Sequence, residues 1–366
     1  MSLLTLDITR CVHTSNKLAT CTSCVDVCPV ETLRIENGQI SFIPSDCVGC
    51  GGCLSACPTD AYTLDDFKPL NYIFKFLEED RKVLSCKDVE FPCIAALSVE
   101  ELLSMVLLVK DELTLDIAPC KECPIASTNL PIIEQRAQEV HFLLEAMMQK
   151  KELRVGSVDS RFENVHDGIS RRKLLSKEGM QKMLTIKEQF YNSVEAGDEN
   201  VKTHTISTQD IGKIKAKNIP DRRSLLLMAM KRAHIPEKFH NIAIEDISFI
   251  SQKDLDEDLC TNCQMCYRIC PTGALSSDSR GSVIEFNPLA CVACYSCHDV
   301  CEPDALTLRK SFALVNFFEP KKETLVRFSM QRCDECGSFF AYRGGEKMCR
   351  RCMIEEQEAK ALWGIE

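Results

Sequence analysis

Cys47-Val-Gly-Cys50-Gly-Gly-Cys53-Leu-Ser-Ala-Cys57-Pro58 is the stretch that decides the fold of this chain. Its four cysteines are separated by two, two and three residues, and a proline follows the last one. Cysteines this close in sequence cannot all form disulfides without strain, but their thiolates can all reach one inorganic core. Thiolate is the soft ligand that iron–sulfur clusters require. The stretch therefore predicts an iron–sulfur site.

The composition supports a metal-binding role for the thiols. The chain has 366 residues, enough for roughly two to three domains, and 24 of them are cysteines. Residues 1–10 hold no apolar run long enough for a signal peptide, and no stretch approaches the ~18 consecutive apolar residues of a membrane helix. We therefore expect a cytoplasmic protein, without membrane insertion, in a reducing compartment where thiols bind metal.

The net charge limits which classes of macromolecule the chain is expected to bind. Its formal value of −10 argues against nucleic acid, which would need a basic face, and suits docking onto a basic patch of a redox partner. The sequence has no dinucleotide fingerprint and no P-loop. We therefore expect neither a nicotinamide nor a flavin of its own, and a protein as the redox partner.

A first module is predicted over residues 1–66. A second run, Cys21-Thr-Ser-Cys24-Val-Asp-Val-Cys28-Pro29, precedes the first, and alternating apolar residues around Asn37-Gly38 predict a β-hairpin between the two. In motif and order of parts, the module resembles the bacterial two-[4Fe–4S] ferredoxin. The resemblance implies crossed ligation, in which the fourth cysteine of each run binds the other cluster. One cluster would take Cys11, Cys21, Cys24 and Cys57, and the other Cys47, Cys50, Cys53 and Cys28.

Cys11 departs from that pattern. Nine residues separate it from Cys21, where the pattern has two, so this module carries seven extra residues. Either Cys11 binds through a longer loop, or its cluster lacks one ligand and is a three-iron or labile site.

A second module is predicted over residues 67–152, with the order strand, helix, strand, helix. Strands are expected at 81–85 and 113–117, and helices at 99–108 and about 130–150. Cysteines follow both strands, at the edge where ligands collect in open α/β units. The layout is similar to the delta subunit of methyl-viologen-reducing hydrogenase, and more loosely to thioredoxin-like ferredoxins. The four thiols concerned are Cys86, Cys93, Cys120 and Cys123.

Three interpretations of these four thiols remain open. They hold a fifth iron–sulfur cluster, or they form a zinc site or a dithiol redox pair at Cys120 and Cys123, or they are inert buried thiols. A CxxC pair at a helix start lowers thiol pKa values, which makes exchange chemistry physically possible.

Residues 251–310 form a third module that repeats the first. Its runs are Cys260-Thr-Asn-Cys263-Gln-Met-Cys266-Tyr-Arg-Ile-Cys270-Pro271 and Cys291-Val-Ala-Cys294-Tyr-Ser-Cys297-His-Asp-Val-Cys301. Crossed ligation implies one cluster at Cys260, Cys263, Cys266 and Cys301, and another at Cys291, Cys294, Cys297 and Cys270. His298 lies within the second run and is expected beside the cluster or at the surface rather than as a ligand.

The remaining parts are a spacer and a tail. Residues 153–250 contain no cysteine and are expected to be a helical spacer between the ferredoxin modules. Residues 311–366 carry two CxxC pairs, Cys333/Cys336 and Cys349/Cys352. These resemble a zinc ribbon or a rubredoxin-like site, so we expect one Zn²⁺, or a single iron, bound by four thiolates.

The whole sequence thus predicts an α+β multidomain protein: two ferredoxin-type modules, a small thioredoxin-like or Rossmann-like α/β domain, a helical spacer and a zinc ribbon. The favoured function is relay of single electrons through four [4Fe–4S] clusters to or from a larger redox enzyme. The resemblance to multi-domain ferredoxin-type proteins implies a formate dehydrogenase or hydrogenase as that enzyme. One alternative is an assembly or regulatory iron–sulfur factor. The other is a thiol or metal oxidoreductase with its active site at Cys120 and Cys123.

Overall fold

Two antiparallel strand pairs frame the first cysteine-rich module. The computed structural model describes residues 4–158 and 210–364. β1 (Leu4–Leu6) pairs with β4 (Tyr62–Leu64), and β2 (Leu33–Glu36) pairs with β3 (Gln39–Phe42). The turn between β2 and β3 is Asn37-Gly38, and both residues have positive φ, which confirms the predicted hairpin. The short helices of this module are α1 (Val12–Ser15), α2 (Ser23–Asp26), η1 (Pro44–Asp46) and α3 (Gly52–Ala56).

The second unit is a three-stranded parallel sheet with helices. The strands β5 (Val83–Ser85), β6 (Leu113–Asp116) and β7 (Leu153–Gly156) lie in that order. Its helices are α4 (Pro69–Glu78), η2 (Ile94–Ala96), α5 (Val99–Leu108), η3 (Ala118–Glu122) and α6 (Ala126–Ala146). The predicted order of strand, helix, strand, helix is confirmed by β5, α5, β6 and α6.

Local sequence explains where α5 begins. Ser98 accepts a hydrogen bond from the Glu101 backbone N–H, and the Glu101 carboxylate accepts one from the Ser98 N–H at 2.7 Å. This capping box satisfies backbone donors that would otherwise be buried without partners. The helix predicted at about 130–150 begins and ends about four residues earlier, at Ala126 and Ala146.

Two stretches of the predicted helical spacer are strands. β7 completes the parallel sheet, and β8 (Asn241–Ala243) pairs with β13 (Ser311–Ala313). A four-residue strand is too short to be recognised by periodicity alone. The described helices of this region are α9 (Asp210–Lys215), α10 (Asp221–Met230) and η4 (Ile244–Asp246). The rest of the predicted spacer, residues 159–209, lies outside the described residues.

The third module repeats the strand pairing of the first. β9 (Lys253–Leu255) pairs with β12 (Leu306–Leu308) as β1 pairs with β4, and β10 (Leu275–Ser277) pairs with β11 (Val283–Phe286) as β2 pairs with β3. β14 (Glu323–Arg327) extends the second pair to a three-stranded sheet. Its short helices are α11 (Met265–Ile269), η5 (Pro288–Ala290), α12 (Ser296–Asp299) and α13 (Val315–Phe318).

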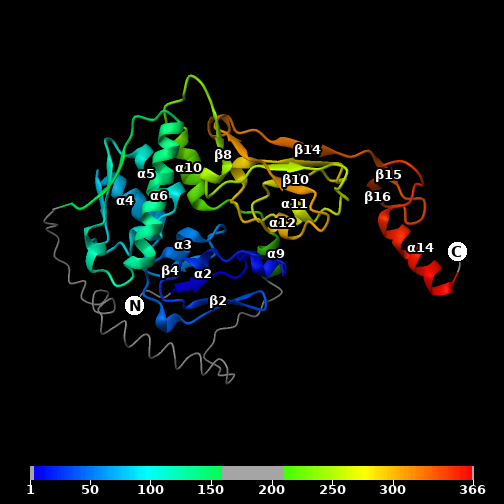
Figure 1. The fold of residues 1–366 in the computed structure, drawn as a ribbon, viewed down its shortest axis with the longest axis horizontal. Helices are drawn as coiled ribbons and strands as arrows, with labels where there is room; N and C mark the ends of the chain where they lie inside the picture. Colours follow the sequence, from blue (N-terminus) through cyan, green and yellow to red (C-terminus); the bar gives the residue numbers. More distant parts are fainter. Residues whose placement is uncertain (1–3, 159–209, 365–366) are drawn as a thin grey trace.

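The first part of the predicted tail, residues 311–327, does not belong to the cysteine-bearing unit, because β13 pairs with β8 and β14 pairs with β11. The rest of the tail, from Met330, is a hairpin followed by a helix. β15 (Met330–Arg332) pairs with β16 (Phe339–Ala341), and α14 (Arg350–Trp363) follows. The second CxxC pair therefore lies at the start of a helix. In Figure 1 this tail projects from the third module at the C-terminal end, and Arg343 contacts that module.

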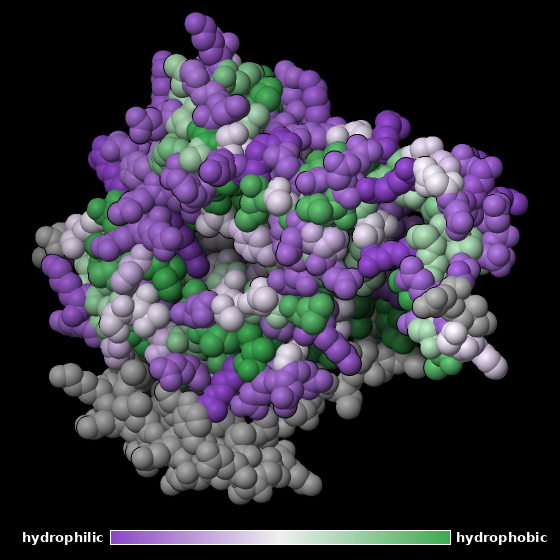
Figure 2. All heavy atoms as spheres, turned by 45° about the vertical axis from the view of Figure 1, so that its right-hand side comes forward, coloured by the Kyte–Doolittle hydropathy of each residue, from purple (hydrophilic) through white to green (hydrophobic). Residues whose placement is uncertain are grey.

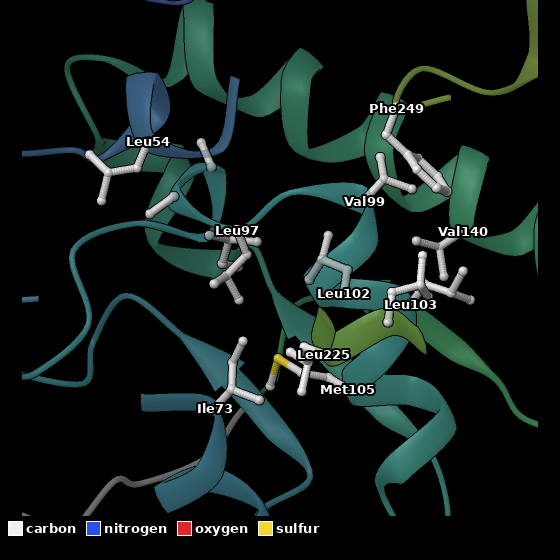
Figure 3. Packing of buried hydrophobic residues seen from close by; sticks show 14 of the residues in the cluster. Leu54, Ile73, Leu97, Val99, Leu102, Leu103, Met105, Val140, Leu225 and Phe249 are labelled. Carbon is white, nitrogen blue, oxygen red and sulfur yellow. The ribbon is translucent and has the colours of Figure 1, made fainter. Parts of the chain in front are cut away.

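One hydrophobic core joins the first module, the parallel sheet unit and α10. Figure 3 shows Leu54 of α3, Leu102 of α5 and Leu225 of α10 in this packing, together with Phe249 from the segment before β9. The third module and the tail have smaller cores of their own. Among the described helices, none combines the length and apolar composition needed to cross a membrane. The face in Figure 2 is mainly hydrophilic, with hydrophobic areas scattered over it.

Candidate iron–sulfur and metal sites

The backbone around the cysteine runs is turned in a way that suits sulfur-rich anions. In three runs, the residues on both sides of the second cysteine have positive φ: Gly49 and Gly51, Asn262 and Gln264, and Ala293 and Tyr295. For a residue with a side chain, this conformation costs about 1–2 kcal/mol. It turns successive N–H groups toward one concave side, as in the backbone nests that hold Fe–S clusters. These three runs therefore fit an inorganic cluster.

The chain turns sharply at the end of each of the four cysteine runs, and these four corners share another feature. The third residue after the last cysteine has positive φ at every corner: Glu31, Asp60, Gly273 and Asp304. The corner at Cys301 keeps this conformation although its proline is displaced by one position. The equal geometry supports the internal repeat. At three corners a threonine hydroxyl approaches the sulfur: Thr32 lies 3.6 Å from Cys28 Sγ, Thr59 lies 3.6 Å from Cys57 Sγ, and Thr272 lies 3.7 Å from Cys270 Sγ.

In the first module the thiols gather in two crossed groups. Burial raises the pKa of the Cys11 thiol to about 12, and the thiols of Cys57, Cys24 and Cys21 raise it further. Burial likewise raises the pKa of Cys50 to about 12, with Cys93, Cys47 and Cys28 among its neighbours. Cys53 is surrounded by Cys50, Cys47, Cys28 and Cys24. Thus Cys11 lies with the group predicted for it, in spite of the longer loop.

The third module shows the same crossing. Burial raises the pKa of Cys260, whose neighbours are Cys263 and Cys301. Burial also raises the pKa of Cys294 well above its ordinary value, and its neighbours are Cys291, Cys270 and Cys297. A thiol that is hard to ionise in a buried site becomes a stable thiolate once a metal supplies the compensating positive charge. The donor sets therefore fit [4Fe–4S] clusters, with Cys266 beside Cys263 and Cys260.

The four thiols of the parallel sheet unit also converge. Burial raises the pKa of Cys86 to about 12, and Cys93, Cys120 and Cys123 raise it further. Cys86 follows β5, and Cys120 and Cys123 follow β6, so the carboxyl edge of the sheet brings them together. Cys93 accepts a hydrogen bond from the Asn129 amide at 3.5 Å.

This group lies beside the first ferredoxin module. Among the neighbouring thiols, Cys93 raises the pKa of Cys50 most, and Ser55 of α3 donates a hydrogen bond of 2.7 Å to the Ala95 carbonyl. A Cβ atom on Gly51 would lie only 2.7 Å from the Cβ atom of Ala96 in η2. Only glycine therefore allows the loop before α3 to approach η2 this closely.

The tail holds the most compact thiol group. The ligand atoms of Cys333, Cys336, Cys349 and Cys352 all lie within 4.8 Å of one another, and Cys336 Sγ is 3.7 Å from Cys349 Sγ. Zn–S bonds of about 2.3 Å in a tetrahedron place the sulfurs about 3.8 Å apart. Hydrogen bonds from Ser338 lower the pKa of Cys336 to about 6, which favours the ligating thiolate. The group therefore fits one tetrahedral metal ion.

The extra residues between Cys11 and Cys21 contact the other ferredoxin module. Asn16 is buried, and its amide donates a hydrogen bond of 3.0 Å to the Ser296 hydroxyl of α12. Thr20 donates to the Asp299 carboxylate through both its N–H and its hydroxyl, at 3.2 and 2.9 Å. The sequence showed the insertion but gave no signal for its contact.

Two consecutive buried arginines of α10 bind the cysteine runs of both modules. Arg222 donates to the carbonyls of Ser55 and Cys57 in the first module. Arg223 is fully buried and donates to the carbonyls of Leu289 and Cys291 in the third module, and to that of Phe249. Glu100 of α5 pairs with both arginines, at 3.2 Å from Arg222 and 2.5 Å from Arg223. The two arginines therefore connect the first module, the third module and the parallel sheet unit. The sequence alone did not predict these contacts.

Other basic side chains also bind the runs. Lys217 donates to the Cys270 carbonyl at 2.6 Å, and Arg343 of the tail donates to the Cys260 carbonyl at 2.5 Å. Lys253 is buried and donates to His298 Nε2 at 2.9 Å. Burial and the Lys253 charge lower the pKa of His298 to about 4, so this imidazole is a neutral acceptor.

Comparison with known proteins identifies two parts of the chain. Residues 10–61 and residues 253–302 each match a family model of 4Fe-4S dicluster domains. The chain is similar to an uncharacterized ferredoxin of Methanocaldococcus jannaschii, with 36% identity over 63 residues, which are 17% of this chain and 94% of that protein. A ferredoxin of Methanothermococcus thermolithotrophicus is 33% identical over 64 residues, 17% of this chain and 98% of that protein.

A third relative is matched over less of its length. Ferredoxin 7Fe of Hydrogenibacillus schlegelii is 40% identical over 47 residues, which are 13% of this chain and 60% of that protein. No solved structure matches the chain.

Proposed function

Because the chain belongs to the ferredoxin family and contains two 4Fe-4S dicluster domains, we propose that it is an electron-transfer protein that relays single electrons through four [4Fe–4S] clusters. The observation that carries the proposal is the crossed gathering of sixteen thiols into two groups per module. Clusters bound there would supply one-electron chemistry, and backbone donors and burial would tune each potential.

The contacts between the modules support a continuous relay. α12, which carries Cys297, touches the insertion of the first module through Asn16 and Thr20. Arg222 and Arg223 bind the carbonyls of Cys57 and Cys291, residues that we assign as ligands in different modules. The two modules are therefore held together at their ligand loops, the arrangement that electron transfer between them needs.

A fifth site would extend the relay. We assign Cys86, Cys93, Cys120 and Cys123 to a further iron–sulfur cluster, next to the cluster of Cys50. Burial raises the pKa of Cys120 to about 11. A thiol that exchanges disulfides needs a lowered pKa, so this site favours a ligand role over a dithiol active site. The tail group is proposed to hold one structural Zn²⁺.

The partner is proposed from resemblance and charge. The net charge of −10 suits a basic docking face, and a formate dehydrogenase or hydrogenase is the proposed class of redox enzyme. Cys263 is the exposed thiol of the two modules, so its cluster lies nearest to a docked partner.

The test is the metal content and redox behaviour of protein prepared without oxygen. Four cubane clusters give about 16 irons per chain, the fifth site adds about two to four, and the tail adds one zinc. A titration followed by electron paramagnetic resonance (EPR) should show several reversible low-potential signals. Cys294→Ser should alter one of them, whereas Leu308→Ala, at an exposed position of the same module, should alter none. Iron-free folded protein whose thiols are free or oxidised to one another would refute the proposal.

A further inference from the structure

Lys253 is a buried cation beside the thiols of the third module. Its side chain is 1% exposed, at the first position of β9. Its ammonium donates hydrogen bonds to the Ser251 hydroxyl at 3.0 Å and to His298 Nε2 at 2.9 Å, neither of which carries a negative charge. In the described ranges 4–158 and 210–364, no carboxylate forms an ion pair with it. Burying an ammonium is costly unless a negative charge compensates it.

The cysteine ligands beside Lys253 supply that negative charge. Lys253 lines the same small cavity as Cys270, Cys291, Cys294 and Cys297, and its positive charge acts on the Cys297 thiol. Ser251 accepts from Lys253 and lies 3.2 Å from Cys291 Sγ, so its hydroxyl proton is directed at that sulfur. Of the four thiols of this site, Cys297 therefore lies beside Lys253 itself, and Cys291 lies beside the Ser251 hydroxyl that Lys253 orients.

Aromatic rings hold the ammonium in place. Its nitrogen lies 5.9 Å from the ring centre of Phe286 and 5.8 Å from that of Tyr295. Both distances are within the range in which a ring face attracts a cation. Lys253 is thus fixed on the site by two rings and two hydrogen bonds.

The repeat provides an internal comparison, because the equivalent position in the first module is Leu4. Lys253 stands seven residues before Cys260, and Leu4 stands seven before Cys11. Lys253 pairs with Leu308 in β12, and Leu4 pairs with Leu64 in β4. Leu4 is buried as well. The two sites thus share strand pairing and ligand order, and at this strand position a buried positive charge in the third module replaces an apolar side chain in the first.

We propose that Lys253 raises the reduction potential of the cluster held by Cys270, Cys291, Cys294 and Cys297 above that of its repeat counterpart at Cys28, Cys47, Cys50 and Cys53. A nearby cation stabilises the reduced form, because reduction adds a negative charge to the cluster. The step is the gain of one electron from a reduced partner cluster or enzyme, with no bond formed and no proton moved. An electron shared between these two sites is therefore held mainly by the site beside Lys253. The inference rests on the proposed electron-transfer function.

The test compares midpoint potentials in the full-length, cluster-loaded protein. Lys253→Leu places at this position the residue that the first module uses. The expected result is a more negative midpoint for one cluster, the one whose EPR signal Cys294→Ser alters, with the other midpoints unchanged. Lys321→Gln is the control, because it removes one positive charge from an exposed side chain near the third module. An unshifted midpoint in Lys253→Leu would overturn the inference.

A second variant covers loss of the cluster in Lys253→Leu. Ser251→Ala keeps the ammonium and removes the hydroxyl that donates to Cys291, so the same midpoint should shift in the same direction by a smaller amount. If Lys253→Leu loses the cluster and Ser251→Ala leaves the midpoint unchanged, Lys253 has a structural role only and the inference fails. Absence of iron–sulfur signals in the unaltered protein would instead refute the proposed function.

Discussion

Replacement of Arg223 by methionine should separate the units that this residue joins. The guanidinium is fully buried, pairs with Glu100 and donates to three backbone carbonyls. Methionine keeps an apolar stem of similar length but removes every donor. The carbonyls of Leu289, Cys291 and Phe249 then lose a partner that water cannot replace in the same place.

The magnitude follows from the buried ion pair. Removing one partner of such a pair costs about 3–5 kcal/mol, because the other charge is left uncompensated. The Glu100 carboxylate keeps Arg222 at 3.2 Å, so we expect the lower end, about 3 kcal/mol. With a urea dependence of about 3 kcal/mol per molar, that loss lowers the unfolding midpoint by about 1 M.

The assay is urea unfolding under anaerobic conditions, followed by the visible absorbance of the clusters. Arg232→Met is the matched control, because Arg232 is an exposed arginine just beyond the end of the same helix and its removal should cost less than about 0.5 kcal/mol. Limited proteolysis should also cut the Arg223→Met variant between the modules sooner than the control. Equal midpoints for the two variants would refute the assignment of Arg223 as the residue that joins the units.

Three further predictions concern pH and metal content. Burial raises the pKa of Glu101 from 4.5 to about 7, so the folded protein holds this proton more tightly than the unfolded chain does. Stability should therefore fall by about 3 kcal/mol as pH rises from about 4.5 to about 7, and Glu101→Gln should abolish this fall in urea midpoints measured across that range. Cys349→Ser should remove one metal ion per chain and leave the iron of the ferredoxin modules unchanged, which metal analysis of both proteins will show; retention of the ion would exclude the tail site. Cys93→Ser should remove only the iron of the Cys86 group, so an iron content equal to that of the unaltered protein would contradict a fifth cluster.

Local spacing carried most of what the sequence predicted correctly. The hairpin around Asn37-Gly38 and the helix that begins after Ser98 depend on residues only a few positions apart, and both are present in the structure. The gathering of Cys86 with Cys120 at the sheet edge follows from the order of strands and helices. In each case the contacts that determine the structure lie within one unit of the fold.

Contacts between distant parts of the chain could not be predicted in this way. Glu100 and Arg223 are 123 residues apart, and Arg223 lies in a charged stretch whose composition is typical of a solvated spacer. A charged side chain is buried only when its partners are already in place, and periodicity within α10 does not report on partners in α5 or beside Cys291. The burial of Lys253 had no signal for the same reason, because its environment is made by Ser251, His298 and rings from two other segments.

The insertion before Cys21 illustrates how an irregularity in one module can be explained by its neighbour. Seen within the first module alone, the extra residues weaken the case for Cys11 as a ligand, because they lengthen the loop that must return to the cluster. In the structure the added loop is fixed at three points: His13 contacts the Cys21 carbonyl at 2.7 Å, and Asn16 and Thr20 bind α12 of the third module. Fixing the loop removes the entropy cost of ordering it when a cluster binds, and Cys11 remains among Cys21, Cys24 and Cys57. The irregularity is therefore better explained as the contact that holds the two dicluster modules together than as the loss of a ligand.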